Sequence, residues 1–201
     1  MLRQVCGALV EAHAAGLVHR DLKPGNVIVA NLGGQGDVAK LLDFGLVQDL
    51  SADAEDRLTR AGTVLGTPAY MSPEQAAGES AVDSRGDIYS LGAVAFFALA
   101  GWPPFQGKSV GQVLAAHRSE PAPPLIDFRP DAPADLAAVV ARCLAKEPAD
   151  RFQSATDLDL ALGQCRCVAD WSAERAAEWW QVKTGDRKLA RPNLDMASVC
   201  Q

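Results

Sequence analysis

The chain has 201 residues, enough for one domain with a sizeable core, or for one domain with a tail. Hydrophobic residues make up 48% and charged residues 22%, which excludes a wholly disordered or collagen-like chain. The 19 Lys and Arg against 25 Asp and Glu give a net charge of −6. We therefore expect no bulk nucleic-acid binding, because neutralising phosphates requires a basic surface. A small anionic ligand is not excluded.

Cysteine usage and apolar runs bear on the compartment. The five cysteines are Cys6, Cys143, Cys165, Cys167 and Cys200, a scattered odd set that is typical of a reducing compartment. Cys165, Cys167 and Cys200 either offer three thiolates to zinc or are ordinary reduced thiols. The first residues lack the apolar core of a secretory leader, and the most apolar run, residues 91–102, is too short to span a bilayer. We expect a cytoplasmic protein, or one at the cytoplasmic face of a membrane if a flanking segment carries a span.

Hydrophobic periodicity organises the start of the chain. Apolar residues at three- and four-residue steps predict a helix over residues 1–15, stopped by Gly16. Two short β-branched or apolar runs, residues 27–30 and 38–42, predict strands joined by a hairpin loop at residues 31–36. The glycines of this loop lack the spacing and the following helix of a phosphate-binding loop, so a turn is the favoured interpretation.

The rest of the chain is mostly helical. Residues 46–66 are polar and predict a long loop. The helices expected after it span residues 84–100, 109–120, 134–146 and 154–162. Residues 165–201 form a tail with a short helix over residues 172–182 and three tryptophans, which either meet a partner or cover an edge of the core. The predicted fold class is mainly α, with a small two-stranded piece near its start.

Three motifs carry the chemistry. Residues 19–26 read His-Arg-Asp-Leu-Lys-Pro-Gly-Asn, and residues 43–45 read Asp-Phe-Gly. In this order they resemble the catalytic loop and metal-binding triplet of eukaryotic-type protein kinases. Residues 66–74, Gly-Thr-Pro-Ala-Tyr-Met-Ser-Pro-Glu, resemble the family's segment that docks the substrate hydroxyl, and the run Ser-Pro-Glu-Gln is similar to bacterial members. The resemblance implies ATP and Mg²⁺ as cofactors and a serine or threonine of a protein substrate as acceptor.

Phosphoryl transfer needs the phosphates held, their charge neutralised and the attacking hydroxyl aimed. Asp21 is suited to accept the hydroxyl proton, and Lys23 to place a positive charge near the transferring phosphoryl group. Asn26 and Asp43 offer hard oxygen ligands to magnesium, which needs few protein ligands. Lys23, Asn26 and Asp43 are therefore the expected cofactor-binding residues. The resemblance adds Thr67, which it pairs by hydrogen bonds with Asp21 and Lys23, to the catalytic set.

The resemblance also implies structural roles for His19, Arg20, Phe44, Gly45, Glu74, Asp87 and Arg151. Asp87 is expected to brace the backbone at His19 and Arg20, since a buried carboxylate without such donors is costly. Glu74 is expected to form an ion pair with Arg151.

Thr59 and Thr63 are candidate phosphorylation sites in the polar loop, with Ser51 a weaker third. In kinases with an arginine before the catalytic aspartate, as Arg20 stands here, a loop phosphate supplies the partner of that cation. The alternative is that these hydroxyls are only solvated loop side chains.

The resemblance covers residues 1–164, which correspond to the family's larger lobe only. The glycine-rich loop, strand lysine and helix glutamate of the smaller lobe are not found before His19, and Lys40 stands too late in the chain to serve. We therefore expect a partial kinase domain that needs the missing lobe or an upstream chain as partner and transfers phosphate negligibly alone. The alternative is a short, non-catalytic scaffold or binding module.

Overall fold

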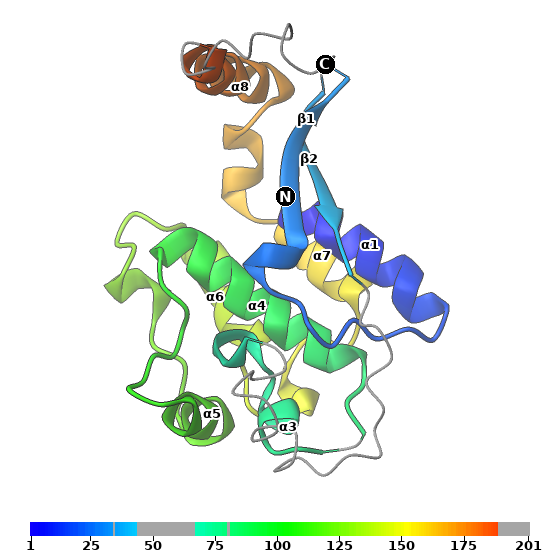
Figure 1. Ribbon diagram of the computed structural model, residues 1–201, viewed down its shortest axis with the longest axis vertical. Coiled ribbons are helices and arrows are strands. Elements are labelled where there is room, and N and C mark those ends of the chain that lie inside the picture. The colour runs from blue at the N-terminus through cyan, green and yellow to red at the C-terminus, as the bar shows by residue number, and fades with distance from the viewer. Residues whose placement is uncertain (34, 44–66, 80, 189–201) are drawn as a thin grey trace, which may run out of the picture.

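The computed structural model describes residues 1–33, 35–43, 67–79 and 81–188, with side chains as far as residue 183. Helices gather around the central helix α4 (Ser84–Ala100), and a two-stranded hairpin projects from this helical body, with the last helix beside its far end (Figure 1). The structure confirms the predicted fold class, a mainly helical lobe with a short β-hairpin.

The other helices lie close to the predicted ranges. They are α1 (Leu2–Ala14), α3 (Pro73–Ala76), α5 (Val110–Ser119), α6 (Ala134–Cys143), α7 (Ala155–Gly163) and α8 (Ala173–Lys188). Short 3₁₀ turns occupy Pro24–Asn26, Pro68–Tyr70, Leu125–Asp127, Pro148–Asp150 and Arg166–Asp170. Two predicted ends are wrong: α6 ends at Cys143 rather than at residue 146, and α8 continues beyond residue 182.

Helix α4 is the centre of the core because it is apolar on every face and other elements cover it. Its first turn is capped by Asp83, whose carboxylate accepts a hydrogen bond from the backbone N–H of Arg85 at 2.8 Å. Gly101 ends the helix in the left-handed conformation, with φ of 81°. None of the described helices combines the length and apolarity needed to cross a bilayer.

The hairpin pairs β1 (Val27–Leu32) with β2 (Gln35–Leu41) in antiparallel register. Val27 lies opposite Leu41 and Leu32 opposite Gln35, with an irregularity between Ala30 and Leu32. The predicted hairpin loop at residues 31–36 is therefore too long, because most of it pairs as strand.

Two of the three glycines of that segment, Gly33 and Gly36, have different roles. Gly33 has φ of 60°, as a tight turn requires. Gly36 gives space for helix α8: a Cβ there would lie 3.0 Å from Cδ1 of Trp180 and 3.2 Å from Cβ of Ala176. Local sequence cannot distinguish a turn glycine from one that admits a helix from the far end of the chain.

The cysteines of the described part are free thiols. Cys165 is buried and donates its S–H to the carbonyl of Ala161. No group of three or more His, Cys, Asp or Glu side chains among the described residues is arranged for a metal ion. Cys200 lies outside the described residues.

The contact between α4 and α6 is set by Gly92. A Cβ at this position would lie 2.5 Å from Cβ of Cys143, a distance that the two helices can relieve only by moving apart. We expect Gly92→Ala to lower the free energy of unfolding by ~1–3 kcal/mol, as overpacking does in other cores. Urea unfolding measures this change.

The matched control is Gly111→Ala, since a Cβ at that helical position meets nothing within 4 Å. It should leave stability unchanged or raise it by up to ~1 kcal/mol, because alanine is the better helix former. Equal effects of the two substitutions would show that the α4–α6 contact is not tight.

Candidate active site

A buried carboxylate holds the backbone of residues 19 and 20. Asp87, in the first turn of α4, is 1% exposed. Its Oδ2 accepts the N–H of His19 and its Oδ1 the N–H of Arg20, both at 2.8 Å. The ring of His13, on α1, contacts the same Oδ2 through Nε2 at 2.8 Å. Three donors compensate the burial of this charge and fix the start of the candidate catalytic loop against the core.

Arg20 takes a backbone conformation that few non-glycine residues adopt, with φ of 62°. This conformation costs about 1–3 kcal/mol, so it persists only where surrounding contacts hold the backbone in it. Asp87 holds its N–H, and Nε2 of Gln75 donates to its carbonyl at 2.6 Å. Gln75 in turn accepts the N–H of Ser72 through Oε1 at 3.0 Å, as part of the capping box of α3. The chain after residue 67 is thus tied to the loop at Arg20.

His19 links the loop to the end of β2. Its ring is fully buried, and Nε2 lies 2.9 Å from the carbonyl oxygen of Leu42. Nδ1 receives the N–H of Asp21 at 3.3 Å. The network therefore assigns the proton to Nε2, which donates to the carbonyl, while Nδ1 accepts. The N–H of Leu42 donates to the carbonyl of Asn26 at 2.8 Å, so both backbone groups of Leu42 are bound to the loop.

Three candidate residues meet directly. Nζ of Lys23 lies 2.6 Å from Oδ2 of Asp21. Nδ2 of Asn26 donates to the carbonyl of Asp21 at 2.8 Å and to its Oδ2 at 3.3 Å. Asn26 is buried, whereas Asp21 and Lys23 are half-buried and so accessible to a reactant. The Pro24–Asn26 turn brings the amide back toward the aspartate.

Asp43 follows Leu42 at the exit of the hairpin and has φ of 51°, a conformation that aspartate tolerates better than most residues. Asn26 immediately precedes β1, so both expected metal ligands stand at the base of the same hairpin, one on each strand side. Among the described residues, Asn26 makes its side-chain hydrogen bonds through Nδ2, which leaves Oδ1 available to a cation. An amide oxygen and a carboxylate at this base fit a hard divalent cation.

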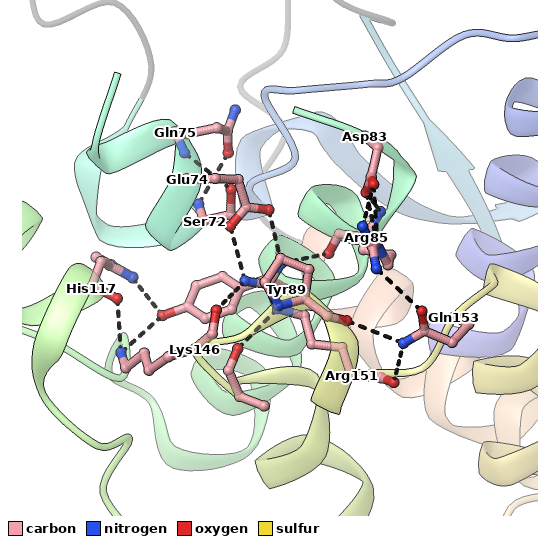
Figure 2. Close-up of polar contacts among 12 residues, drawn as sticks. Ser72, Glu74, Gln75, Asp83, Arg85, Tyr89, His117, Lys146, Arg151 and Gln153 are labelled. Carbon is pink, nitrogen blue, oxygen red and sulfur yellow. Dashed lines mark hydrogen bonds and ion pairs between the residues drawn. The ribbon is translucent and has the colours of Figure 1, made fainter. Parts of the chain in front are cut away.

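Glu74 and Arg151, which the resemblance pairs, form an ion pair in the core. Figure 2 shows Arg151 directed at Glu74. Nη1 donates to Oε1 of Glu74 at 2.8 Å and to the carbonyl of Arg85 at 3.0 Å. Nη2 donates to Oε2 of Glu74 at 2.9 Å and to the carbonyl of Lys146 at 2.7 Å, and Nε donates to the carbonyl of Ala145 at 2.9 Å. All five N–H groups of this fully buried guanidinium have acceptors.

Residues 1–159 match the family described as protein kinase domain. The chain belongs to the protein kinase family. Serine/threonine-protein kinase Pkn1 of Myxococcus xanthus is 45% identical over 154 residues, 77% of this chain and 22% of that protein. PknD of Mycobacterium tuberculosis is 43% identical over 162 residues, 80% of this chain and 23% of that protein. PknH of the same organism is 39% identical over 178 residues, 89% of this chain and 27% of that protein.

The chain therefore spans about a quarter of the length of these curated relatives. The match includes the candidate loop, Asp43 and the Glu74–Arg151 pair, all of which lie within residues 1–159.

Some predicted site residues lie outside what the structure describes: Phe44, Gly45, Ser51, Thr59 and Thr63. Their assignments stay predictions. Thr67 is described and exposed at the start of the Pro68–Tyr70 turn. No hydrogen bond between described residues joins Thr67 to Asp21 or Lys23, so its catalytic role also stays a prediction.

Two residues that hold the candidate loop are not predicted by the sequence analysis, His13 and Gln75. His13 lies three turns along a helix predicted only from its apolar face, and its bond to Asp87 spans 74 residues of sequence. Gln75 was noted only as part of the run Ser-Pro-Glu-Gln. A Gln at the third position after a Ser N-cap is a recognisable capping-box signal, but it does not report the second bond to Arg20.

Two neighbours of Arg151, Lys146 and Tyr89, both contact His117. Lys146 donates through Nζ to the carbonyl of His117 at 2.9 Å, and Tyr89 contacts Nδ1 of His117 at 2.9 Å (Figure 2). Burial, and then the nearby Lys146 charge, lower the pKa of His117 to about 4. Burial likewise lowers the pKa of Lys146 to about 8. At neutral pH the imidazole is uncharged, so it adds no repulsion against the ammonium group of Lys146.

The Glu74–Arg151 pair makes the free energy of unfolding depend on pH. Burial by itself raises the pKa of Glu74. The hydrogen bonds from Arg151, from a backbone N–H and from Ser72, together with the Arg151 charge, outweigh burial and leave the pKa below its ordinary value of 4.5. The stabilisation is thus fully present above the unfolded-state pKa and is lost as pH falls through the lower folded-state pKa. We expect Glu74→Gln to lower the free energy of unfolding at pH 7 by ~3–5 kcal/mol and to flatten its decline below pH 4.5.

Urea unfolding at a series of pH values measures both effects. The control is Asp131→Asn, because the Asp131–Arg129 pair is also an ion pair at 2.6 Å but lies in solvent. The control should leave stability and its pH profile unchanged. An unaltered acid decline in Glu74→Gln would contradict the assignment of that decline to Glu74.

Proposed function

We propose that this chain forms the catalytic-loop side of a serine/threonine protein kinase that transfers the γ-phosphoryl group of ATP to hydroxyls of a protein substrate. The observation that carries the proposal is the contact of Asp21, Lys23 and Asn26 at the base of the hairpin that leads to Asp43. In it, a half-buried carboxylate stands beside a cation and accepts a hydrogen bond from the Nδ2 group of Asn26. The names of the relatives as serine/threonine kinases support the acceptor class.

Each residue has a distinct task in this proposal. Asp21 orients the acceptor hydroxyl and accepts its proton. Lys23, held against Asp21, brings positive charge to the transferring group. Asn26 through Oδ1 and Asp43 through its carboxylate hold Mg²⁺. Bound ATP would supply the phosphoryl group, and bound Mg²⁺ would neutralise its charge.

The rest of the site acts as a support. Asp87 and Gln75 fix both backbone polar groups of Arg20, so Asp21 starts from a preorganised position. The two bonds of Leu42 keep Asp43 close to Asn26. Phosphorylation at Thr59 or Thr63, a protein partner that supplies the small lobe, and a cytoplasmic location are further parts of the proposal.

A second candidate function is a non-catalytic scaffold with a kinase-like fold. The presence of Asp21, Lys23, Asn26 and Asp43 together argues against it, because a scaffold does not require an intact set of catalytic side chains.

Phosphoryl transfer should require the small-lobe residues that hold ATP. We expect the purified 201-residue chain to transfer negligible label from γ-labelled ATP to itself or to a general protein acceptor, because the glycine-rich loop and strand lysine are not among its residues. A product extended by the upstream genomic reading frame should be active. Ordinary turnover by the 201-residue chain would contradict the first expectation. An in-frame stop codon directly upstream would favour the scaffold.

In the active, extended product we expect Asp21→Asn to lower kcat by about 10²–10⁴-fold, the usual contribution of a positioned general base. Substrate KM values should change far less. The same radiolabel assay, run at several substrate concentrations, separates the two constants. Asp127→Asn, which alters an exposed carboxylate in the Leu125–Asp127 turn, is the matched control and should keep full activity. Retained kcat in Asp21→Asn would remove Asp21 from the mechanism.

A further inference from the structure

A single carboxylate near the far end of the hairpin receives two tryptophans from the tail. Oδ1 of Asp37 accepts the indole N–H of Trp180 at 2.7 Å, and its Oδ2 accepts the indole N–H of Trp171. These partners lie more than a hundred residues away along the chain. A tryptophan N–H is a donor only, so each indole uses its single polar group on this residue.

Close packing accompanies the two hydrogen bonds. Helix α8 lies beside the far end of the hairpin (Figure 1). Ala176 is 3% exposed and packs with Trp180 over Gly36, where no side chain intervenes. Trp180 stacks edge-on against Trp179, with ring centroids 5.2 Å apart. The tail therefore contacts the hairpin through close packing at Gly36 as well as through the two hydrogen bonds to the Asp37 carboxylate.

Gln4, on α1, also binds the hairpin at Asp37. Nε2 of Gln4 donates to the carbonyl of Asp37 at 2.8 Å, and Oε1 of Gln4 accepts the N–H of Ala39 at 2.7 Å. Asp37 has φ of 57° and lies where the strand register is irregular, opposite the stretch between Ala30 and Leu32. The ladder is weakest at such a site, so contacts from outside the hairpin decide its geometry.

The ladder runs without further irregularity from this point to the candidate active site. Val38 pairs with Ala30, and the pairing continues to Leu41 opposite Val27. Asn26 precedes this last pair, and Leu42 follows it with its N–H on the Asn26 carbonyl. A change at Asp37 therefore reaches the base of the hairpin through one continuous set of paired residues.

We propose that the tail segment of residues 165–183 is a clamp that docks on the hairpin through Asp37, and that this docking holds the hairpin base where Asn26 and Asp43 stand. The docking itself is independent of catalysis. Its consequence for the metal ligands rests on the proposed function. Asp37 is then a positioning residue, which acts on the site through β2.

Two substitutions on opposite sides of the contact test the clamp. Asp37→Asn keeps the size and tolerates the positive φ, but it offers one acceptor oxygen and places an NH₂ group against the other indole donor. The double variant Trp171→Phe with Trp180→Phe keeps aromatic bulk and removes both donors. Trp102→Phe is the matched control, since Trp102 is 58% exposed and follows the distant end of α4.

Residue-resolved NMR on the 201-residue chain, without nucleotide, gives the readouts. The chain has four tryptophans, so four indole N–H signals report separately. Asp37→Asn should shift those of Trp171 and Trp180 and leave that of Trp102 in place. Amide hydrogen exchange at residues 38–42 should accelerate at least ~10-fold, the equivalent of one charge-assisted hydrogen bond, while the amides of α4 keep their protection. The Leu42 amide is the decisive one, because its bond closes the hairpin base.

Three results would overturn the proposal. Unchanged indole signals in Asp37→Asn would show that the tail does not dock there. Shifted indole signals with unchanged exchange at Leu42 would show that docking does not reach the hairpin base. If amide exchange in Asp37→Asn accelerated as much in α4 as at residues 38–42, Asp37 would support the whole fold and not the hairpin specifically. Because no step uses ATP, these failures are distinct from a failure of the proposed function, which appears as activity independent of Asp21.

Discussion

The carboxylate of Asp87 is the constraint on which the candidate site depends. It is carried by α4, in which residues 86–96 are all buried, so its own position is fixed by the core. A charge in such surroundings must keep its hydrogen-bond donors, because an unpaired buried carboxylate is far more costly than any single surface contact. The donors available are the backbone N–H groups of His19 and Arg20 and the ring of His13. If the loop moved away from α4, the Asp87 carboxylate would stay buried without these hydrogen-bond donors. The backbone just before Asp21 is therefore held in place.

A second buried charge extends the same principle to the segment after residue 67. Arg151 gathers Glu74 and three backbone carbonyls, two of which follow the end of α6. Glu74 lies on α3, next to Gln75, which binds the carbonyl of Arg20. The core therefore connects α3, α4, α6 and the candidate loop through groups that all require partners. Removing one member leaves others unsatisfied, which makes the network cooperative.

The elements that sequence analysis predicted well are those whose signals are local. The N-caps Ser109 and Ser154 and the apolar faces of α5 and α7 lie within the elements they define. The cause of the early end of α6 is a tertiary contact: the carbonyls of Ala145 and Lys146 accept hydrogen bonds from Arg151. The pairs of Asp87 and of Glu74 followed from the resemblance to kinases rather than from periodicity. His13 and Gln75 were missed because their partners are far away in sequence.

The hairpin shows why a long-range contact is needed at all. A two-stranded ribbon is only marginally stable in water, and β2 has β1 on one edge only. Gln4 uses its amide to occupy the other edge as a strand would, with one bond donated to Asp37 and one accepted from Ala39. Gln4 thus binds β2 from α1 at Asp37 and Ala39, and the tail tryptophans bind the carboxylate of the same Asp37. In the proposed function this ribbon presents Asn26 and Asp43 at its base, and the contacts that support it come from α1 and from the tail, two segments far apart in the sequence.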